Sequence, residues 1–419
     1  MLAIVKEYVR KVQFWGFTGV CNFFLGLFKA SSTRKFFLRN AKQQLAQEPG
    51  VTIVAPFQEK LSLSKAMRDL VFCIHDADIP VQALSTSAKS QVANREIEPL
   101  LTPKRDFRIL KHPLAIELFA GKIPPEIPIR RAHVVFWEFE SGLLEAFPAL
   151  RSVDTVIAMS DFNAAYFRKV LPPNVKVAKL LYPFRFSPPT LPPPEQTRRR
   201  FGIGENDFAV FFNFDYGSSF FRKNPDGAMR AFAKAFRDTP DAKLVFKTNR
   251  AKDFPRAHAT LRDLASSLDI ADRFISIDDF LSRDDIYAIT AACDIYLSLH
   301  RGEGFGLGIA EAMSLGKPAI VTDYGGSTEF CTPETAFLVP YSMRTLQRGQ
   351  IDNPCYHEVA FCADPDIEAA AATMRKCHES RSFCIDKGSR AKIFMESHFS
   401  PERFRESMTA LMEGFGANG

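Results

Sequence analysis

The sequence predicts an α/β protein of two domains, each built on a parallel sheet. The chain has 419 residues, more than one hydrophobic core usually supports. In both halves, short apolar runs alternate with segments of helical spacing, which is the pattern of a parallel sheet with crossover helices. Between the halves, residues 182–196 contain six prolines in fifteen positions. This stretch predicts a stiff interdomain linker without regular structure.

The first half begins with an apolar, β-branched run, VTIVAPF at 51–57, which predicts a buried strand. A segment of helical spacing at 62–79 and a second apolar run at 80–84 complete a β-α-β unit. Further apolar runs predict strands at 133–140 and 154–160, and the residues after them predict a helix at 162–170.

The second half repeats the alternation. Apolar runs predict strands at 207–215, 243–248, 295–300 and 318–323, and helical spacing predicts helices through Phe236, at 286–294 and at 308–315. Asn224 and Pro225 are the preferred N-cap and first-turn residues of the first of these helices. Gly316 is a C-cap signal for the last helix, with Pro318 beyond it.

The charge distribution argues against a general nucleic-acid-binding protein. The net charge is +6, and residues 1–50 alone account for it, so the rest of the chain is neutral. Within that basic region, FWGFTGVCNFFLGLF at 14–28 is uncharged but shorter than the ~20 residues that span a bilayer. It fits an interfacial anchor on an anionic membrane surface, a helix packed on the domain, or a leader.

Cysteine usage favours a reduced, cytoplasmic setting. The basic N-terminal segment adds the expectation of a peripheral position at the inner face of the plasma membrane. The chain has eight cysteines, none in a C-x-x-C pair, and no signal-peptide cleavage pattern. Cys355 and His357 are close in sequence, but isolated cysteine and histidine residues are usually packed rather than metal ligands.

The most informative stretch is HRGEGFGLGIAEAMSLGKP at 300–318. It joins a predicted strand to a predicted helix through a glycine-rich loop, at the sheet edge where ligands of such folds bind. Glycines let backbone N–H groups approach a ligand, and the helix adds its positive end. Glu303 and Glu311 can each hold sugar hydroxyls. A tight turn with two solvated glutamates is the alternative.

A second motif, FFRKNPDGAMRAF at 220–232, places Arg222 and Lys223 directly before a helix N-cap. Cations are unfavourable at this end of a helix unless an anion lies between them. We therefore expect a phosphate clamp that stabilises a leaving group, with two exposed basic residues as the alternative. Lys247 ends the neighbouring strand and could converge on the same place.

These residues carry a resemblance to a known family. SLHRGEGFGLGIAEAMSLGKPAIVTDYGG closely resembles the E-x7-E region of retaining GT4-type glycosyltransferases of glycosyl transferase group 1. FFRKNPDGAMRAF resembles the basic motif of that family, and FWEFESGLLEAFP at 136–148 resembles bacterial polysaccharide-type members. The resemblance covers roughly residues 51–415. It implies a GT-B fold, in which two Rossmann-like domains face across a cleft and a C-terminal helix crosses back to the first.

The resemblance implies a division of the chain and a role for each site residue. The parts are an N-terminal segment (1–48), an acceptor domain (49–185), a linker (186–206), a donor domain (207–395) and a crossover helix (396–419). Lys223, helped by Arg222, would neutralise the diphosphate, Glu303 would lie beside the donor sugar, and Glu311 would hold the ribose. The backbone that would face sugar and diphosphate belongs to Gly304, Phe305, Gly306 and Leu307.

The implied reaction moves a hexose from a nucleotide-diphosphate sugar to a glycan or lipid-linked acceptor, with retention and without a metal or other cofactor. Two departures stand against it: Asn213 and Phe214 occupy a position where many members carry arginine, and the loop at 55–64 has no glycine. A catalytically silent relative, or another GT-B enzyme such as a sugar-nucleotide epimerase, therefore remains an alternative. Glu138 and Ser160 are further guesses for the acceptor domain, and Asp364 and Asp366 are expected to be structural.

Overall fold

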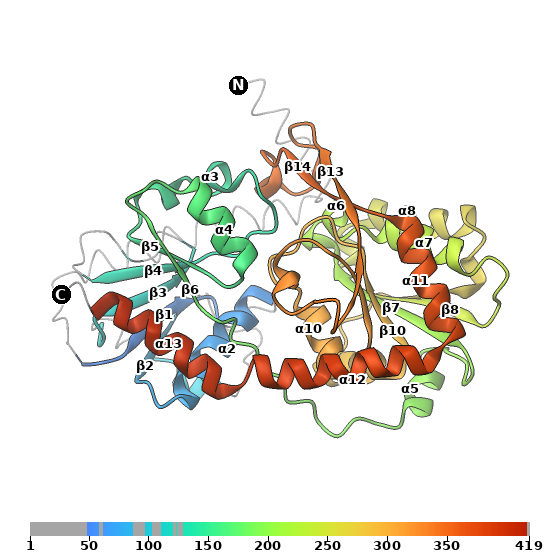
Figure 1. The fold of residues 1–419 in the computed structure, drawn as a ribbon, viewed down its shortest axis with the longest axis horizontal. Helices are drawn as coiled ribbons and strands as arrows, with labels where there is room; N and C mark the ends of the chain where they lie inside the picture. The colour runs from blue at the N-terminus through green and yellow to red at the C-terminus, as the bar shows by residue number, and fades with distance from the viewer. Residues whose placement is uncertain are drawn as a thin grey trace. The chain divides into compact units, whose positions relative to one another are not determined.

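The computed structural model describes residues 48–57, 62–86, 97–102, 110–119, 123 and 129–416. These residues form two compact units (Figure 1). We call the N-terminal unit the described residues up to 137 together with 147–185 and 399–416, and the C-terminal unit residues 138–146 and 186–398. Of the predicted membrane-interface segment, all but Glu48 lies outside the described residues.

The N-terminal unit contains a parallel sheet of six strands in the order β2-β1-β3-β4-β5-β6. The predicted β-α-β unit is confirmed, because β1 pairs in parallel with β2 and α2 connects them. The elements of this unit are β1 (Val51–Ala55), α2 (Ser62–Asp76), β2 (Val81–Ser85), β3 (Leu114–Leu118), β4 (Arg130–Val134), β5 (Thr155–Ala158), α4 (Asp161–Val170), β6 (Lys176–Lys179) and α13 (Pro401–Gly416). Between β4 and β5 in the chain, α3 (Leu143–Ala146) belongs to the C-terminal unit.

The last helix belongs to the N-terminal unit although its residues end the chain. α13 packs against α2 and β6, and the hydroxyl of Ser407 accepts a hydrogen bond from the Leu181 amide at 2.9 Å. Phe404, Met408 and Leu411 form its buried face. A C-terminal helix that returns to the first unit is what the fold prediction requires.

The C-terminal unit contains a second parallel sheet of six strands, in the order β12-β11-β10-β7-β8-β9. The strands are β7 (Phe208–Asp215), β8 (Ala242–Asn249), β9 (Phe274–Ile277), β10 (Ile295–Ser298), β11 (Ala319–Thr322) and β12 (Phe337–Val339). The helices are α5 (Pro194–Arg200), α6 (Phe220–Lys223), α7 (Pro225–Ala235), α8 (Pro255–Ser267), α9 (Arg283–Ala292), α10 (Leu307–Ser314), α11 (Ile367–Glu379) and α12 (Arg381–His398). Strand and helix alternate as predicted.

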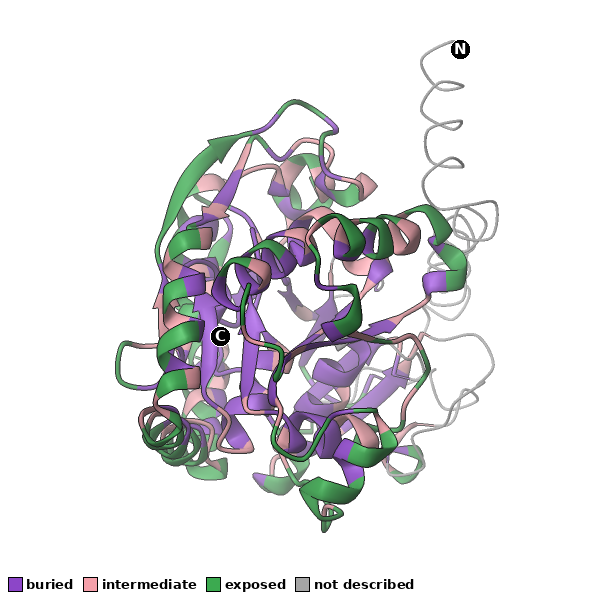
Figure 2. Ribbon diagram, turned by 90° about the vertical axis from the view of Figure 1, so that its right-hand side faces the viewer, coloured by how far each residue is buried: buried purple, intermediate pink, exposed green. Residues whose placement is uncertain are grey.

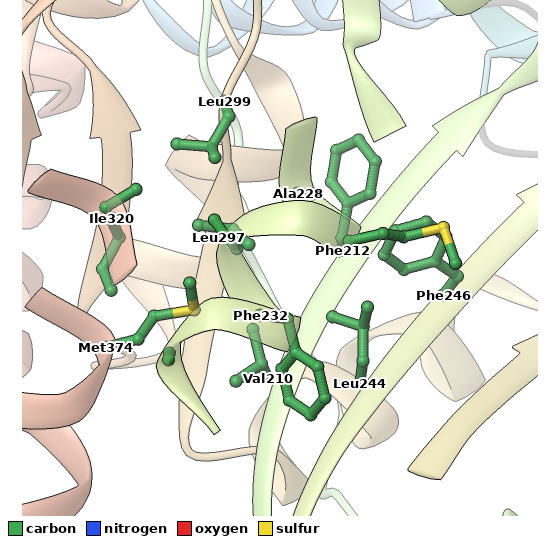
Figure 3. Packing of buried hydrophobic residues seen from close by; sticks show 14 of the residues in the cluster. Val210, Phe212, Ala228, Phe232, Leu244, Phe246, Leu297, Leu299, Ile320 and Met374 are labelled. Carbon is green, nitrogen blue, oxygen red and sulfur yellow. The ribbon is translucent and has the colours of Figure 1, made fainter. Parts of the chain in front are cut away.

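One face of this sheet carries the main hydrophobic core. Alternate residues of β7 and β8, such as Phe212 and Phe246, point to the same side and meet Phe232 of α7 and Met374 of α11 (Figure 3). The rings of Phe212 and Phe246 pack edge to face, with centroids 5.0 Å apart. The strands are buried while the outer faces of the helices are exposed (Figure 2).

The linker prediction is wrong at its C-terminal end, because α5 begins at Pro194 and continues to Arg200. A proline in the first turn costs no hydrogen bond, so the proline run ends where a helix can begin. Arg198 explains why the helix is retained. Its buried guanidinium donates to the carbonyls of Ala292, Gly204 and Asp207 and pairs with Asp294 at 2.9 Å.

The strand predicted at 133–140 ends at Val134 in the structure, as β4. Phe136, Trp137 and Phe139 beyond it are buried by side-chain packing rather than by a strand ladder. The run of apolar residues predicted the burial of these side chains correctly, but it predicted a strand that does not continue past Val134. Strands β3, β6 and β9, each of four or five residues, were not predicted.

A two-stranded antiparallel hairpin extends the C-terminal unit between β12 and α11. β13 (Tyr341–Thr345) pairs with β14 (Phe361–Pro365), and residues 346–360 connect them. We call these fifteen connecting residues the hairpin loop. Connections in α/β units are usually two to six residues long, so this loop is an insertion that calls for a reason.

Candidate donor site

The glycine-rich loop lies between β10 and α10, at the carboxyl edge of the sheet. Residues 301–306 are all buried. Gly306 has φ +93°, in the left-handed region, and precedes the first helical residue, Leu307. At Gly302 a side chain would meet Phe139 and the carbonyl of Glu138, and the ring of Phe305 packs on Phe330 at 5.1 Å. The loop is therefore held rigidly from both sides.

Arg222 and Lys223 lie in the last turn of α6, a helix of four residues that the sequence did not indicate. Asn224 caps α7 as predicted, since its side-chain oxygen accepts from the Gly227 amide at 3.1 Å. The two cations thus stand at the negative end of α6 as well as before α7. The local cost that suggested a phosphate clamp is smaller than the sequence implied.

The structure brings Lys223, Arg222 and Glu303 together. The ammonium of Lys223 forms an ion pair with Oε2 of Glu303, and Nη1 of Arg222 lies 3.5 Å from the same oxygen. Nη1 of Arg222 also donates to the Gly302 carbonyl at 2.9 Å, and its Nε donates to Ser218 at 3.1 Å. Side chains 80 residues apart in the chain thereby meet in one cluster.

The cluster fixes the charge of Glu303. Burial raises the pKa of this carboxyl, but Lys223 and Arg222 together outweigh burial and lower it to about 2. Burial lowers the pKa of Lys223, and the carboxylate of Glu303 offsets only part of that effect. Lys223 and Arg222 both lie at Oε2 of Glu303, so an anionic group that took the place of this oxygen would meet both cations.

His300 lies behind this cluster and was not assigned a role from the sequence. Its Nε2 lies 2.8 Å from the Tyr324 carbonyl and therefore donates to it, which leaves Nδ1 to accept from the Ser298 hydroxyl at 3.0 Å. Burial lowers the pKa of His300 to about 4. It is a neutral histidine with both ring nitrogens in use, and its residue type alone could not show this.

The cluster contains a second carboxyl, Glu138, which the sequence offered only as a guess. Its Oε1 lies 3.9 Å from Nη2 of Arg222, and its side chain accepts a hydrogen bond from Tyr356 of the hairpin loop. Burial raises the pKa of Glu138, and Arg222 opposes that rise. The segment between β12 and α11 is unusually long, and this length is the signal in the sequence that could have pointed to Tyr356.

Glu311 and Lys247 have partners other than this cluster. Glu311, on α10, forms an ion pair with Arg283 of α9. Lys247 is buried on β8 beside Asn213 of β7 and donates to Asn249. Burial lowers the pKa of Lys247, and Asp215 is the acid that opposes this most. Both residues lie in the C-terminal unit.

Asn213 has a partner on this side of the sheet. The hydroxyl of Tyr296 donates to its side-chain oxygen at 2.6 Å. Burial raises the pKa of that tyrosine, and Glu303 and Glu311 raise it further, so the two glutamates of the E-x7-E pattern share this neighbour.

The remaining guesses have structural roles. The hydroxyl of Ser160 caps α4, accepting from Asn163 at 3.2 Å. Asp364 pairs with Arg301 at 3.3 Å, and Asp366 caps α11. The glycine-free stretch 55–64 is described only at 55–57 and 62–64, so the centre of that loop lies outside the described residues.

Among the residues that the structure describes, no group of three or more His, Cys, Asp or Glu is arranged to hold a metal ion. Nor does any helix there combine the length and apolar character needed to cross a membrane.

Three comparisons with known proteins bear on this site. Residues 195–349 match the family described as glycosyl transferases group 1. The chain is 25% identical over 245 residues, 58% of its length, to the lipopolysaccharide core biosynthesis mannosyltransferase LpsB of Rhizobium meliloti. It is 31% identical over 134 residues, 32% of its length, to an N-acetyl-alpha-D-glucosaminyl L-malate synthase of Bacillus anthracis. The matches span 65% and 32% of these two relatives, less than two thirds of each.

Among solved structures, Alr3699/HepE of Anabaena in complex with UDP and glucose is similar, with a TM-score of 0.62. The similarity covers 88% of this chain and 100% of that one at 13% identity. Together with the two parallel sheets and the returning C-terminal helix, it establishes a two-domain fold of the GT-B type.

Proposed function

We propose that the chain is a retaining glycosyltransferase of glycosyl transferases group 1, the family that residues 195–349 match. It would move a hexose from a nucleotide-diphosphate sugar to a glycan or lipid-linked acceptor. The observation that carries the proposal is the cluster of Lys223, Arg222 and Glu303 against the glycine-rich loop. The names of the relatives agree, since LpsB is a mannosyltransferase of lipopolysaccharide core biosynthesis.

In this proposal the two cations take the role that a metal ion has in other transferases. Phosphate oxygens of the donor replace Glu303 as acceptors for Lys223, and Arg222 holds the second phosphate in fork geometry. The released carboxylate of Glu303 accepts hydroxyls of the donor sugar. Lys247, farther along the sheet, adds a positive charge on the nucleotide side.

The rest of the motif positions the nucleotide. Backbone groups of Gly304, Phe305, Gly306 and Leu307 face the sugar and the diphosphate. Glu311 holds the ribose hydroxyls once Arg283 leaves it. The bond between the anomeric carbon and the phosphate oxygen breaks, and the acceptor oxygen bonds to the same face of that carbon. The proton of the acceptor hydroxyl passes to the leaving phosphate, so no second carboxylate nucleophile is required.

A donor panel tests the proposal. The full chain is incubated with UDP-, GDP- and ADP-sugars, with and without bacterial lipid extract, and released nucleotide and glycosylated product are measured. We expect release with one donor class, and loss of at least a hundredfold in Lys223→Ala and Glu303→Ala. The exposed pair Lys234 and Glu368 offers matched controls, Lys234→Ala and Glu368→Gln, which should retain activity.

Each part of the proposal has its own contrary result. Release of nucleotide without a glycosylated product would favour an epimerase. No release and no binding of any sugar nucleotide would favour a catalytically silent relative. A product whose anomeric proton coupling shows inversion would contradict retention, and loss of activity in EDTA would contradict metal independence.

We also propose that residues 1–48 attach the protein to the cytoplasmic face of an anionic membrane. The basis is sequence alone, namely an uncharged aromatic-rich run within a segment that carries the whole net charge. Deletion of residues 1–48 should shift the protein from the membrane to the soluble fraction of a lysate. An unchanged distribution would contradict this attachment.

A further inference from the structure

The hairpin loop, residues 346–360, reaches α6 with the half-buried side chain of Asp352 and the buried side chain of Tyr356. Asp352 contacts the start of that helix and Tyr356 contacts Arg222 near its end. Hairpins that only extend a surface bury little, whereas Tyr356 is 9% exposed. The loop therefore has a specific relation to the helix that carries both cations of the donor site.

Asp352 holds the first residues of α6. One carboxylate oxygen accepts from the hydroxyl of Ser219, and the other accepts from the Phe220 amide at 2.9 Å. Ser219 has φ +79°, a left-handed conformation that residues other than glycine seldom adopt. Such a conformation costs free energy and persists only where neighbouring groups impose it. A four-residue helix cannot impose it, because a single turn is unstable by itself.

Tyr356 holds the other end of α6 through Arg222. The guanidinium carbon lies 5.9 Å from the centre of the tyrosine ring, within reach of a cation–π contact. The tyrosine also donates a hydrogen bond to Glu138, whose carboxyl lies 3.9 Å from Arg222. The ring of Phe139 packs edge to face on Tyr356 at 5.2 Å. Arg222 is thus in contact with Tyr356 and Glu138 as well as with Glu303.

The loop is itself tied to the segment that carries Glu138. The amide of Ala360 donates to the Ser141 hydroxyl at 3.0 Å. At Gly142 a side chain would press on the backbone of Glu358 and Val359. Residues 138–146 and the hairpin loop therefore pack against each other inside the C-terminal unit.

We propose that Asp352, Tyr356 and Glu138 are positioning residues that hold α6 and Arg222 ready for the diphosphate of the donor. This inference rests on the proposed function, and it gives the inserted hairpin a role in that function. Donors fixed before the ligand arrives do not lose conformational freedom on binding, so their fixation appears as affinity for the diphosphate. Lys223, which depends on Glu303 alone for its partner in this cluster, should be less affected.

The experiment measures binding of inorganic pyrophosphate, and of UDP, GDP and ADP, to the full chain by titration calorimetry. Tyr356→Phe keeps the ring and removes the hydrogen bond to Glu138, Glu138→Gln removes the carboxylate charge, and Asp352→Ala removes the cap. We expect dissociation constants for pyrophosphate five- to twentyfold higher in each variant. Asp352→Asn retains one acceptor oxygen and should recover part of the affinity.

Two further readouts separate positioning from a general structural role. The donor KM should rise in step with the dissociation constant while the acceptor KM stays unchanged. The controls are Tyr341→Phe on β13 and Glu358→Gln in the same loop, which should bind pyrophosphate as the wild type does. If Asp352→Ala does not fold, Tyr356→Phe decides the matter.

The outcomes are distinct. A wild-type chain that binds pyrophosphate and a nucleotide, with Tyr356→Phe and Glu138→Gln variants that bind equally well, would overturn this inference and leave the proposed function intact. Variants whose affinity falls only in proportion to a lost folded fraction would also overturn it. A wild-type chain that binds neither pyrophosphate nor any nucleotide would overturn the proposed function and this inference with it.

Discussion

Removal of the carboxylate charge from Glu303 should destabilise the empty protein and increase its demand for an anion. In Glu303→Gln the buried guanidinium of Arg222 and the half-buried ammonium of Lys223 lose their shared partner. The pKa of Glu303 falls from 4.5 to about 2, a preference for the ionised form of ~3 kcal/mol. That value agrees with the cost of about 3–5 kcal/mol for leaving a buried charge without its partner. We expect the free energy of unfolding to fall by about 3 kcal/mol.

Thermal unfolding of the full chain, followed by calorimetry, measures this effect. A domain of this size loses roughly 2–4 °C per kcal/mol, so the transition of the C-terminal unit should move down by about 6–12 °C. Pyrophosphate at a hundred times its dissociation constant adds ~2.7 kcal/mol and should restore most of the loss. Because no carboxylate competes with it, pyrophosphate should also bind Glu303→Gln more tightly than wild type.

The same charge should appear in the pH dependence of stability. The carboxyl of Glu303 titrates at 4.5 in the unfolded chain and at about 2 in the folded one. Its contribution is therefore complete above pH 4.5 and is lost as the pH falls from 4.5 toward 2. The difference in stability between wild type and Glu303→Gln should shrink over that window. Glu368→Gln, which breaks an exposed pair with Lys234, is the control and should change stability by less than about 1 kcal/mol. A Glu303→Gln transition at the wild-type temperature would refute the buried charge cluster.

The other predictions concern the surroundings of the cluster. The pKa of His300 is about 4 in the folded protein and 6.5 in the unfolded chain, so the free energy of unfolding should fall by ~3 kcal/mol as the pH drops from 6.5 to 4. His300→Gln should flatten that part of the curve of stability against pH. A variant curve parallel to that of the wild type would argue against a buried neutral histidine. Arg283 forms an exposed ion pair with the carboxylate of Glu311, so Arg283→Ala should free that carboxylate and tighten nucleotide binding by up to about fivefold, measured by calorimetry. Weaker binding would mean that Arg283 itself contacts the nucleotide. At Gly326 a side chain would overlap the Gly304 carbonyl, so Gly326→Ala should lower the free energy of unfolding by at least ~1–3 kcal/mol, measured by denaturant unfolding. Gly414 lies in a helix with open space around it, so Gly414→Ala is the control and should not lower stability. Equal effects at both glycines would contradict a close backbone approach at Gly326.

The alternation of strands and helices could be predicted because each element has a local cause. Apolar β-branched runs such as 51–57 can be satisfied only in a buried strand, and Asn224 with Pro225 can begin a helix wherever they occur. The predicted secondary structure was wrong where the residue pattern does not match the hydrogen bonding of the backbone. Phe136, Trp137 and Phe139 are apolar and buried without belonging to a strand, and Pro194 begins a helix at the end of a proline run.

The candidate site was predicted in the same way, and only in part. The glycine spacing of 302–308, with Glu303 inside it and Glu311 beyond it, indicated a ligand loop, and a separate motif supplied two cations. It could not indicate that Glu303 pairs with Lys223 or that Glu311 pairs with Arg283. Such pairings depend on which side chains the sheet brings together, and no local pattern records them.

The sequence by itself determined the fold class, the glycine-rich loop and the residue types available for binding an anion and a sugar. The tertiary structure decided which of these residues meet. It joined α6 to the loop after β10 and placed Tyr356 and Glu138 behind Arg222. The physical reason is one of range: helix caps, turns and strand periodicity act over a few residues, while the field at a buried charge depends on whichever side chains packing brings near it.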